Sequence, residues 1–136
     1  MYQYTTQIRV RYAETDQMGV VYYGNYAQYF EVGRVETIRS LGMSYKALED
    51  KGVMLPVVEM NIKYLRPAQY DDLLNIQSTI KELPDKHIIQ FHQDIYNEAG
   101  KMITSGVVRL YFLDKENRKR VDIPKELHEK LAVFFK

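Results

Sequence analysis

The sequence predicts an α+β domain in which one long helix is covered by a curved antiparallel sheet. Two observations predict this architecture. One stretch has apolar residues at helical spacing, and five stretches alternate polar and apolar residues, as half-buried strands do. Four of these strands follow one another along the chain, so we expect them to pair antiparallel and to form one layer against the helix. All 136 residues are assigned to a single domain, residues 1–136.

The first strand is predicted over Thr6–Tyr12, where Ile8, Val10 and Tyr12 alternate with polar residues. A loop from Ala13 to Gly24 follows this strand. The loop contains acidic residues and leads directly into the predicted long helix, so its side chains are expected near the start of that helix.

The long helix is predicted over Asn25–Leu41, because apolar residues recur there near the helical period. Asn25 is a suitable N-cap, since its side-chain oxygen can accept an early backbone N–H. Gly42 suits the left-handed position that ends helices. Gly33 lies on the apolar face, where the missing side chain is expected to let the helix lie close to the sheet.

The remaining strands are predicted from Leu55 onward. Their alternating segments are Val58–Tyr64, Leu74–Lys81, Ile89–Ile95 and Met102–Leu113. Turns are predicted at Pro84-Asp85-Lys86 and Asn97-Glu98-Ala99-Gly100. A short helix over Lys125–Phe134, with Pro124 at its first position, ends the chain. Open sheet edges favour pairing with a second copy, so we expect a dimer or a larger symmetric oligomer.

Composition narrows the function classes. Lys and Arg number 19 against 18 Asp and Glu, and a net charge of +1 disfavours nucleic-acid binding, which needs a clear basic excess. The chain has no cysteine, which excludes disulfides, thiolate metal sites and a cysteine nucleophile. No apolar stretch approaches the roughly 20 residues of a membrane helix and no signal-peptide pattern is visible, so a cytoplasmic protein without membrane insertion is expected.

The stretch from Tyr12 to Glu31 contains the candidate chemistry. Asp16 lies in the loop ahead of a helix N-terminus and can act as a general base or a nucleophile. The free N–H groups at the helix start, at Tyr23 and Gly24, can bind a developing oxyanion. Together these groups suit acyl transfer to water. On chemistry alone Glu14 is an equal rival of Asp16, and an Asp close before a Gly is also ordinary turn chemistry.

The same stretch resembles the signature of the 4-hydroxybenzoyl-CoA thioesterase family of hotdog-fold acyl-CoA thioesterases. It is most similar to the bacterial branch, which has a pattern like Tyr-x-x-Thr-Asp-x-x-Gly-Val-Val-Tyr. The matching residues are Tyr12, Thr15, Asp16, Gly19, Val20, Val21 and Tyr22, followed by Asn25-Tyr26 and Tyr29-Phe30-Glu31. A second similar stretch runs from Ile62 to Asp72. The resemblance covers nearly the whole chain and is weakest after Asp114.

The resemblance implies a hotdog fold and hydrolysis of an acyl-CoA thioester without a cofactor, since coenzyme A is part of the substrate. It implies that Asp16 is the catalytic carboxylate and that the backbone N–H of Tyr23 polarises the thioester carbonyl. It also implies a dimer with substrate tunnels at the subunit interface, and dimers that often pair into tetramers. Many bacterial members have His where this chain has Tyr23. Both residues supply the backbone N–H, but a tyrosine cannot take over a role of the histidine side chain.

The substrate site is predicted from residues near the loop and from available cations. Candidates for an apolar acyl slot are Val21, Tyr26, Val57, Val58 and Met60, each of which also suits an ordinary core. Tyr12 and Asn25, from the matching stretch, are further substrate-binding candidates. The cations available to the phosphates of coenzyme A are Lys63, Arg66, Lys86 and the run Arg118-Lys119-Arg120. Lys86 is preferred, because a turn beside a groove can present a cation to phosphate.

The three histidines have no spacing that suggests a metal site. His87 and His92 are five residues apart on a predicted strand, so they are expected on opposite faces of the sheet. His128 falls in the predicted terminal helix.

Other functions are compatible with the same fold. A dehydratase or hydratase would need a histidine with a carboxylate at the active loop or helix, and no histidine precedes His87. A non-catalytic acyl-thioester-binding protein would bind without turnover. A thioesterase acting on acyl-carrier protein instead of coenzyme A, and short aliphatic, long aliphatic or aromatic acyl groups, all fit the sequence.

Overall fold

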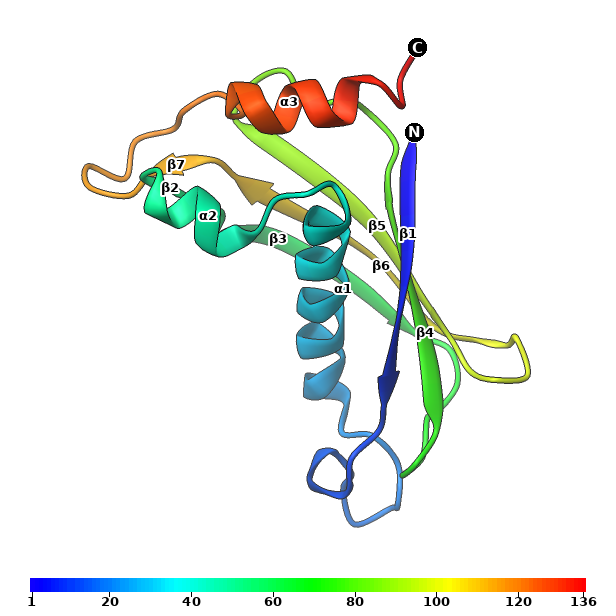
Figure 1. Cartoon of the computed structure of the whole chain (residues 1–136). Helices are drawn as coiled ribbons and strands as arrows, with labels where there is room; N and C mark the ends of the chain where they lie inside the picture. The colour runs from blue at the N-terminus through cyan, green and yellow to red at the C-terminus, as the bar shows by residue number, and fades with distance from the viewer.

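The computed structural model describes every residue from Met1 to Lys136. Its main element is a five-stranded antiparallel sheet with the strand order β1-β4-β5-β6-β3. The long helix α1 (Tyr26–Ser40) crosses one face of this sheet, so the domain has two layers (Figure 1). The predicted architecture, with five strands, one long helix and a short C-terminal helix, is confirmed.

The sheet has one buried face and one polar face. Its strands, in spatial order, are β1 (Tyr2–Arg9), β4 (Leu73–Ile80), β5 (Ile88–Tyr96), β6 (Met102–Tyr111) and β3 (Val57–Tyr64). In β5, for example, Ile89 and Phe91 are buried under the helix, whereas Gln90 between them is exposed. The strands β1 and β3 form the two edges, and β3 pairs with β6 alone.

Helix α1 approaches the sheet closely at two glycines. A Cβ added to Gly33 would lie 2.7 Å from Cγ2 of Ile76, and one added to Gly106 in β6 would lie 2.5 Å from Cε2 of Phe30. Both distances are shorter than van der Waals contact, so a larger residue would push the helix away from the sheet. The close approach predicted at Gly33 is confirmed.

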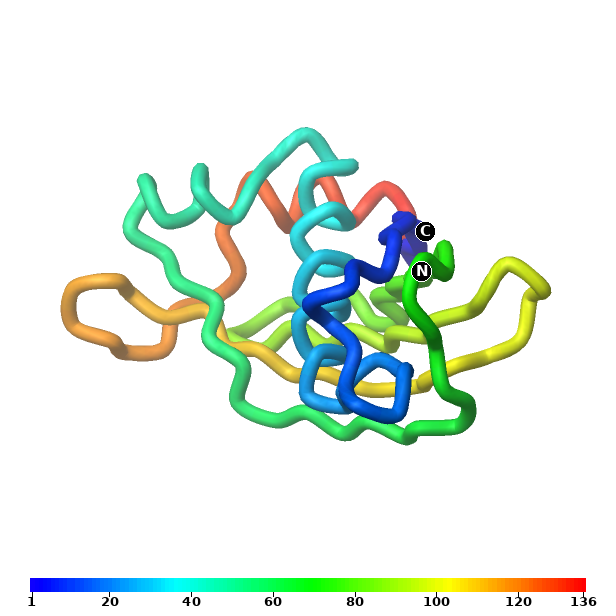
Figure 2. Tube along the Cα trace, turned by 90° about the horizontal axis from the view of Figure 1, so that it is seen from below, coloured from blue at the N-terminus to red at the C-terminus, as the bar shows by residue number.

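Smaller elements gather at the C-terminal end of α1. They are α2 (Tyr45–Asp50), the pair β2 (Val53–Met54) and β7 (Leu113–Asp114), and α3 (Lys125–Ala132). The sequence analysis missed α2 and the β2–β7 pair. Seen from the other end of the molecule, both chain termini lie side by side (Figure 2), and the N-terminal amine donates to the carbonyl of Phe134 at 3.0 Å. None of the helices combines the length and the apolar character of a membrane span.

The first strand differs from its prediction. It begins at Tyr2 and ends at Arg9, and Tyr12 instead opens a short 3-10 helix, η1 (Tyr12–Glu14). Val10 still bonds to Asp72 and Asp71, in the turn before β4, and the chain leaves the sheet after Val10. Tyr12, expected on the inward face of a strand, is therefore 77% exposed.

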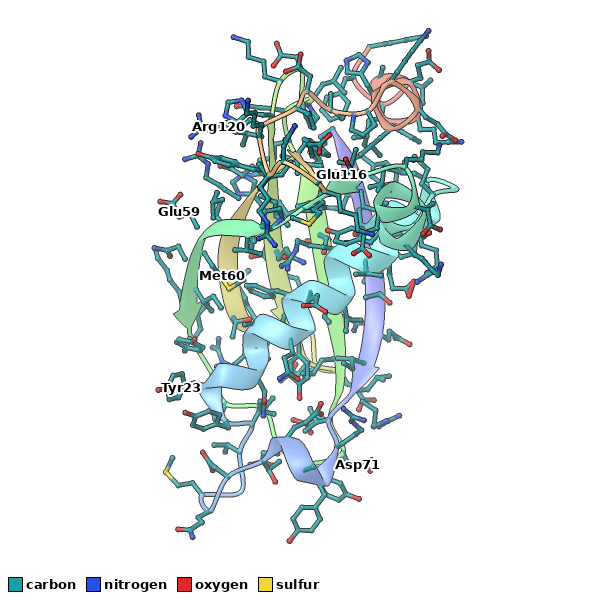
Figure 3. All side chains as sticks on the ribbon, turned by 90° about the vertical axis from the view of Figure 1, so that its left-hand side faces the viewer. Tyr23, Glu59, Met60, Asp71, Glu116 and Arg120 are labelled. Atoms are coloured by element: carbon teal, nitrogen blue, oxygen red, sulfur yellow. The ribbon has the colours of Figure 1, made fainter.

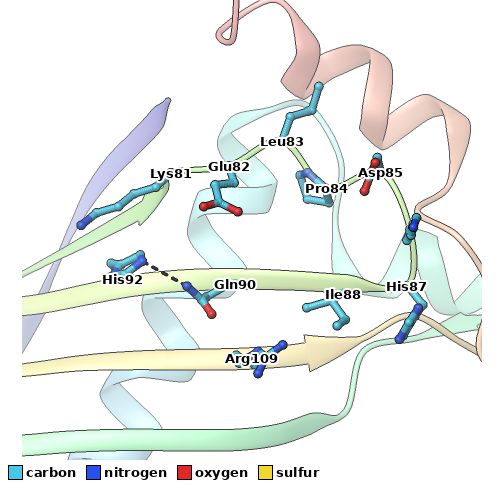
Figure 4. Close-up of a pocket in the computed structure, with 11 residues that line it drawn as sticks. Lys81, Glu82, Leu83, Pro84, Asp85, His87, Ile88, Gln90, His92 and Arg109 are labelled. Carbon is cyan, nitrogen blue, oxygen red and sulfur yellow. Dashed lines mark hydrogen bonds between the residues drawn. The ribbon is translucent and has the colours of Figure 1, made fainter.

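The predicted separation of His87 and His92 is wrong. β5 begins only at Ile88, so strand alternation does not extend to His87. Both side chains line one cavity on the polar face of the sheet, where His92 contacts Gln90 (Figure 4).

Candidate active site

Asp16 opens a tight turn between η1 and the helix start. Its amide donates to the carbonyl of Val20 at 2.9 Å, and its own carbonyl accepts the amide of Gly19 at 3.0 Å. Gly19 has a positive φ of 79°, which closes the turn at low steric cost. One carboxylate oxygen, Oδ1, accepts the amide of Met18 at 2.9 Å, and the other makes no hydrogen bond. Asp16 thus stabilises a turn, as residues of this type often do before a glycine. One of its carboxylate oxygens remains without a hydrogen bond, at a partly exposed position.

Glu14, the rival carboxylate, is buried and fully engaged. Its Oε1 accepts the Arg11 amide at 2.8 Å and the Tyr29 hydroxyl at 3.0 Å, and its Oε2 forms an ion pair with the Arg11 guanidinium at 3.2 Å. Burial alone would raise the pKa of Glu14, but the bonds from Arg11 and Tyr29 outweigh it and hold that pKa below its usual value. For Tyr29, burial and the Glu14 carboxylate raise the pKa of the hydroxyl. Glu14 therefore anchors η1 to α1.

The backbone of Glu14 ties the loop to the start of the helix. Its carbonyl accepts both the amide of Tyr22 at 3.0 Å and the side-chain amide of Asn25 at 2.8 Å. Asn25 occupies the predicted N-cap position of α1, but its side chain makes no capping bond, because its side-chain amide donates to the loop instead. The chain also pairs Thr15 with Val21 across the turn. These bonds hold Asp16 close to the residues that begin the helix.

The helix start presents two unpaired amides. A 3-10 turn, η2 (Tyr23–Asn25), precedes α1, so no earlier turn supplies acceptors for its first N–H groups. The amides of Tyr23 and Gly24 donate to no other group of the chain, whereas that of Asn25 donates to the carbonyl of Tyr22. A Cβ on Gly24 would lie 2.8 Å from the Tyr22 ring, so the glycine keeps this turn tight. The two predicted oxyanion donors are thus the two free amides of the helix start.

An apolar cavity of about 230 Å³ lies at Tyr23, and neither Gly24 nor Asp16 is among the residues that line it. It is lined by Val21, Tyr23, Tyr26, Tyr64, Leu65, Arg66 and Pro67, five of which are hydrophobic. Val21 and Tyr26 were predicted as slot residues. The contribution of Tyr64–Pro67 was missed, because this segment comes some 40 positions later and no local pattern places it beside the helix start. The backbone bond from Val21 to the carbonyl of Ala68, at 2.8 Å, brings the two segments together.

Of the predicted phosphate-binding cations, Arg66 lines the apolar cavity, whereas Lys63 and Lys86 line other cavities. Lys63 lines a cavity of about 510 Å³ on the polar face of the sheet, and Lys86 lines a neighbouring one of about 340 Å³ (Figure 4). Each of these two cavities has only two hydrophobic lining residues, and both are lined by Lys81. Tyr23 lies at the start of α1, and Arg120 lies at the opposite end of the molecule (Figure 3).

The other predicted substrate residues do not line the apolar cavity, and of these Asn25 and Met60 are half-buried whereas the rest are exposed. Tyr12 packs its ring on Tyr70, with centroids 5.5 Å apart, and does not line the apolar cavity. Val57 and Val58 begin the edge strand β3 and are 43% and 45% exposed. They lie at the other end of that strand from Tyr64, which does line the cavity.

The fold and this site define a class of protein. The loop that leads into the two unpaired amides carries a carboxylate with a free oxygen, and an apolar cavity lies at Tyr23. Groups of these kinds can hold a carbonyl group and direct an attack on it. The class is therefore that of acyl-transfer enzymes built from one helix on a curved sheet.

Comparison with known proteins gives the family. The sequence matches the Thioesterase-like superfamily over residues 10–131. YneP of Bacillus subtilis, which is provisionally named an acyl-CoA thioesterase, is 40% identical to this chain. The match covers 88% of this chain and 86% of YneP. The acyl-CoA thioester hydrolase YbgC of Escherichia coli is 32% identical over 88% of this chain and 89% of its own. The chain belongs to the family of hotdog-fold thioesterases, which confirms the resemblance.

A solved structure supports the same conclusion. The DHNA-CoA thioesterase of Staphylococcus aureus superimposes with a TM-score of 0.93 and 31% sequence identity. The match covers 99% of this chain and 92% of the other. The hotdog architecture therefore extends over the whole domain.

Proposed function

We propose that this chain hydrolyses acyl-CoA thioesters, with Asp16 as base or nucleophile and the Tyr23 and Gly24 amides as the oxyanion hole. Family membership and the activities named for its relatives support hydrolysis of an acyl-CoA thioester. The observation that carries the assignment of residues is the pair of unpaired amides beside a carboxylate that keeps one oxygen free. Since acyl-CoA thioesters are cytoplasmic metabolites, the proposed location is the cytoplasm.

The proposed reaction begins with the thioester carbonyl oxygen at the two amides. Asp16 takes a proton from water while the water oxygen attacks the carbonyl carbon, and the amides stabilise the negative charge that develops on the carbonyl oxygen. Collapse of the tetrahedral species breaks the carbon–sulfur bond. Coenzyme A leaves as a thiolate and takes the proton held by Asp16, which returns Asp16 to its carboxylate form, and the acid is released. In the nucleophilic variant, Asp16 itself attacks, and water then hydrolyses the mixed anhydride.

A dimer through the β3 edge would complete the site. β3 has one unpaired edge, and its exposed side chains include Val57, Val58 and Tyr64. If two copies pair their β3 strands antiparallel, the Tyr64 end of each meets the Val57 end of the other. Near the Val57 end lie Lys86 and a cluster around Tyr111, whose ring is covered by Arg120 at 4.9 Å.

These cations would then belong to the site of the other subunit. The charges at the Val57 end lie at the opposite end of the chain from its own amides (Figure 3). An antiparallel dimer would bring them toward the amides of the second copy. Coenzyme A could thus keep its thioester at one subunit and its phosphates at the other. Lys86 keeps its proposed role in this arrangement, and a dimer of dimers is compatible with it.

A hydrolysis screen tests the proposed function. Acetyl-, butyryl-, hexanoyl-, octanoyl- and benzoyl-CoA are incubated with the protein, and release of free thiol is followed. Turnover of at least one thioester is expected, together with its loss in Asp16→Asn. Binding of acyl-CoA without thiol release would instead identify a non-catalytic binding protein.

The alternative thiol carrier is tested in parallel. An acyl group presented on acyl-carrier protein is compared with the same group on coenzyme A at equal concentration. A higher kcat/KM for the coenzyme A ester is expected. The opposite preference would reassign the chain to the thioesterases of acyl-carrier protein.

A further inference from the structure

Tyr64, the last residue of β3, forms one wall of the apolar cavity. Its ring centroid lies 6.0 Å from that of Tyr23, nearly edge-on at 80°, and 5.7 Å from that of Tyr26. The ring therefore touches both the residue that carries an oxyanion donor and the deepest aromatic residue of the cavity.

Tyr26 is fixed in its place. It is 3% exposed, its ring packs edge-on against Tyr29 at 5.7 Å, and its hydroxyl accepts the amide of Ala68 at 3.3 Å. Tyr29 is held in turn by its bond to Glu14 at 3.0 Å. An acyl group cannot displace this side of the cavity without breaking the anchor of the catalytic loop.

Tyr64 is held much less firmly. It is 50% exposed, and unlike Tyr26 its hydroxyl makes no hydrogen bond within the chain. Its ring packs on the rings of Tyr23 and Tyr26. Among the aromatic residues that line the cavity, Tyr64 can therefore be substituted without removing a buried side chain from the core.

This cavity is the one suited to an acyl group. Hydrophobic residues make up five of its seven lining residues, whereas the two cavities on the polar face have two each among eleven and twelve. Tyr23, whose amide is a proposed oxyanion donor, is among the lining residues of the apolar cavity. A thioester held there would direct its acyl group at the Tyr64 and Tyr26 rings.

We propose that Tyr64 determines acyl-chain length by closing the cavity beside the oxyanion donors. The inference rests on the proposed function. With Tyr64 in place, its ring would block the extension of an acyl group from the space of about 230 Å³ at Tyr23, so short acyl groups would be favoured over long ones. Each methylene that a hydrophobic pocket does or does not accommodate changes kcat/KM by about 10–200-fold. Removal of this ring should therefore change the chain-length preference strongly.

The test compares kcat/KM for octanoyl-CoA and butyryl-CoA. In Tyr64→Ala the octanoyl-to-butyryl ratio is expected to rise at least about tenfold. Tyr64→Phe keeps the ring and should leave the ratio within about twofold of the wild type, because the hydroxyl has no partner. Tyr70→Ala is the matched control, since this tyrosine is similarly exposed at 57% but packs on Tyr12 outside the cavity.

A variant that fills the cavity tests the proposal in the opposite direction. Leu65 is 51% exposed and lines the same cavity, so Leu65→Trp should fold and should lower the hexanoyl-to-butyryl ratio. Opposite shifts in Tyr64→Ala and Leu65→Trp support the proposal.

Two results would overturn it. In the first, Tyr64→Ala still turns over substrate but its octanoyl-to-butyryl ratio stays within about twofold of wild type. If Tyr64→Ala does not fold, the same conclusion follows from a hexanoyl-to-butyryl ratio of Leu65→Trp that stays within about twofold of wild type. Tyr64 then does not set chain length, and the proposed function stands. If the folded wild type releases no thiol from any ester, the proposed function fails and this inference fails with it.

Discussion

Two neighbouring turns of the same loop hold carboxylates that differ in burial and in hydrogen bonding. In η1, Glu14 is 6% exposed, and both of its oxygens are bonded to Arg11 or Tyr29. In the next turn, Asp16 is partly exposed and bonds only the amide of Met18. A saturated, buried carboxylate resists movement and proton uptake, whereas an unsaturated one can accept a proton or attack. The difference separates the anchor from the reactive group, two residues apart.

The largest expected effect is the loss of activity in Asp16→Asn. An asparagine oxygen can still accept the Met18 amide, so the turn and the melting temperature should change little. Loss of the base should lower kcat/KM by about 10²–10⁴. Steady-state thiol release and a thermal melt measure the two effects. Near-full turnover in this variant would remove Asp16 from its role and turn attention to Glu14.

The second largest effect is expected at the backbone of Tyr23. Proline is tolerated at the first position of a helix, and the preceding Tyr22 has an extended ψ of 131° that suits it. Tyr23→Pro removes the N–H, whereas Tyr23→Ala removes the same side chain and keeps the N–H. We expect kcat of the proline variant to be about 10²–10³ lower than that of the alanine variant. Equal rates would show that this amide does not bind the oxyanion.

The third effect is on stability at the anchor. Glu14→Gln removes the charge that Arg11 and Tyr29 bond, and hydrogen bonds to charged groups contribute about 1.5–3 kcal/mol. A decrease of about that size in the free energy of unfolding is expected from urea titration. Turnover per folded molecule should stay close to wild type. A large loss of kcat with normal stability would reverse the roles assigned to the two carboxylates.

The smallest effect is the pH dependence of that stabilisation. Because the folded-state pKa of Glu14 lies below its ordinary 4.5, the folded protein binds this proton more weakly than the unfolded chain. Its contribution is therefore present above pH 4.5 and is lost as the pH falls through the folded-state pKa. Urea midpoints of wild type and Glu14→Gln, measured from roughly pH 6 to pH 3, should converge toward the acid end. A constant difference across this range would contradict the lowered pKa.

The local patterns of the sequence predicted most of the elements. Alternation predicted the strands of the sheet, and the helical period together with Gly33 and Gly42 predicted α1, its close approach to the sheet and its end. Errors arose where a distant segment decides the local conformation. The chain leaves the sheet after Val10, which bonds the turn before β4, and Asn25 bonds the carbonyl of Glu14 instead of capping the helix.

The candidate site was predictable only in part. A loop carboxylate ahead of a helix start identified Asp16, Tyr23 and Gly24, since free amides at a helix N-terminus are a local property. Local pattern did not predict which of the Glu14 and Asp16 carboxylates is free to react. The two differ in burial and in their bonding partners from other segments. The contribution of Tyr64 and Leu65 to the cavity depends in the same way on a contact between distant parts of the chain.

By itself the sequence determined the order of the long helix, the five strands of the sheet and the terminal helix, because these follow from periodicity and glycines. Its contiguous motif gave the resemblance to the hotdog family and the positions of the amides. Only the tertiary structure decided which carboxylate is free, which rings wall the cavity and how far the cations lie from the helix start. Those properties depend on burial and on contacts between segments that are distant along the chain, and no local pattern records them.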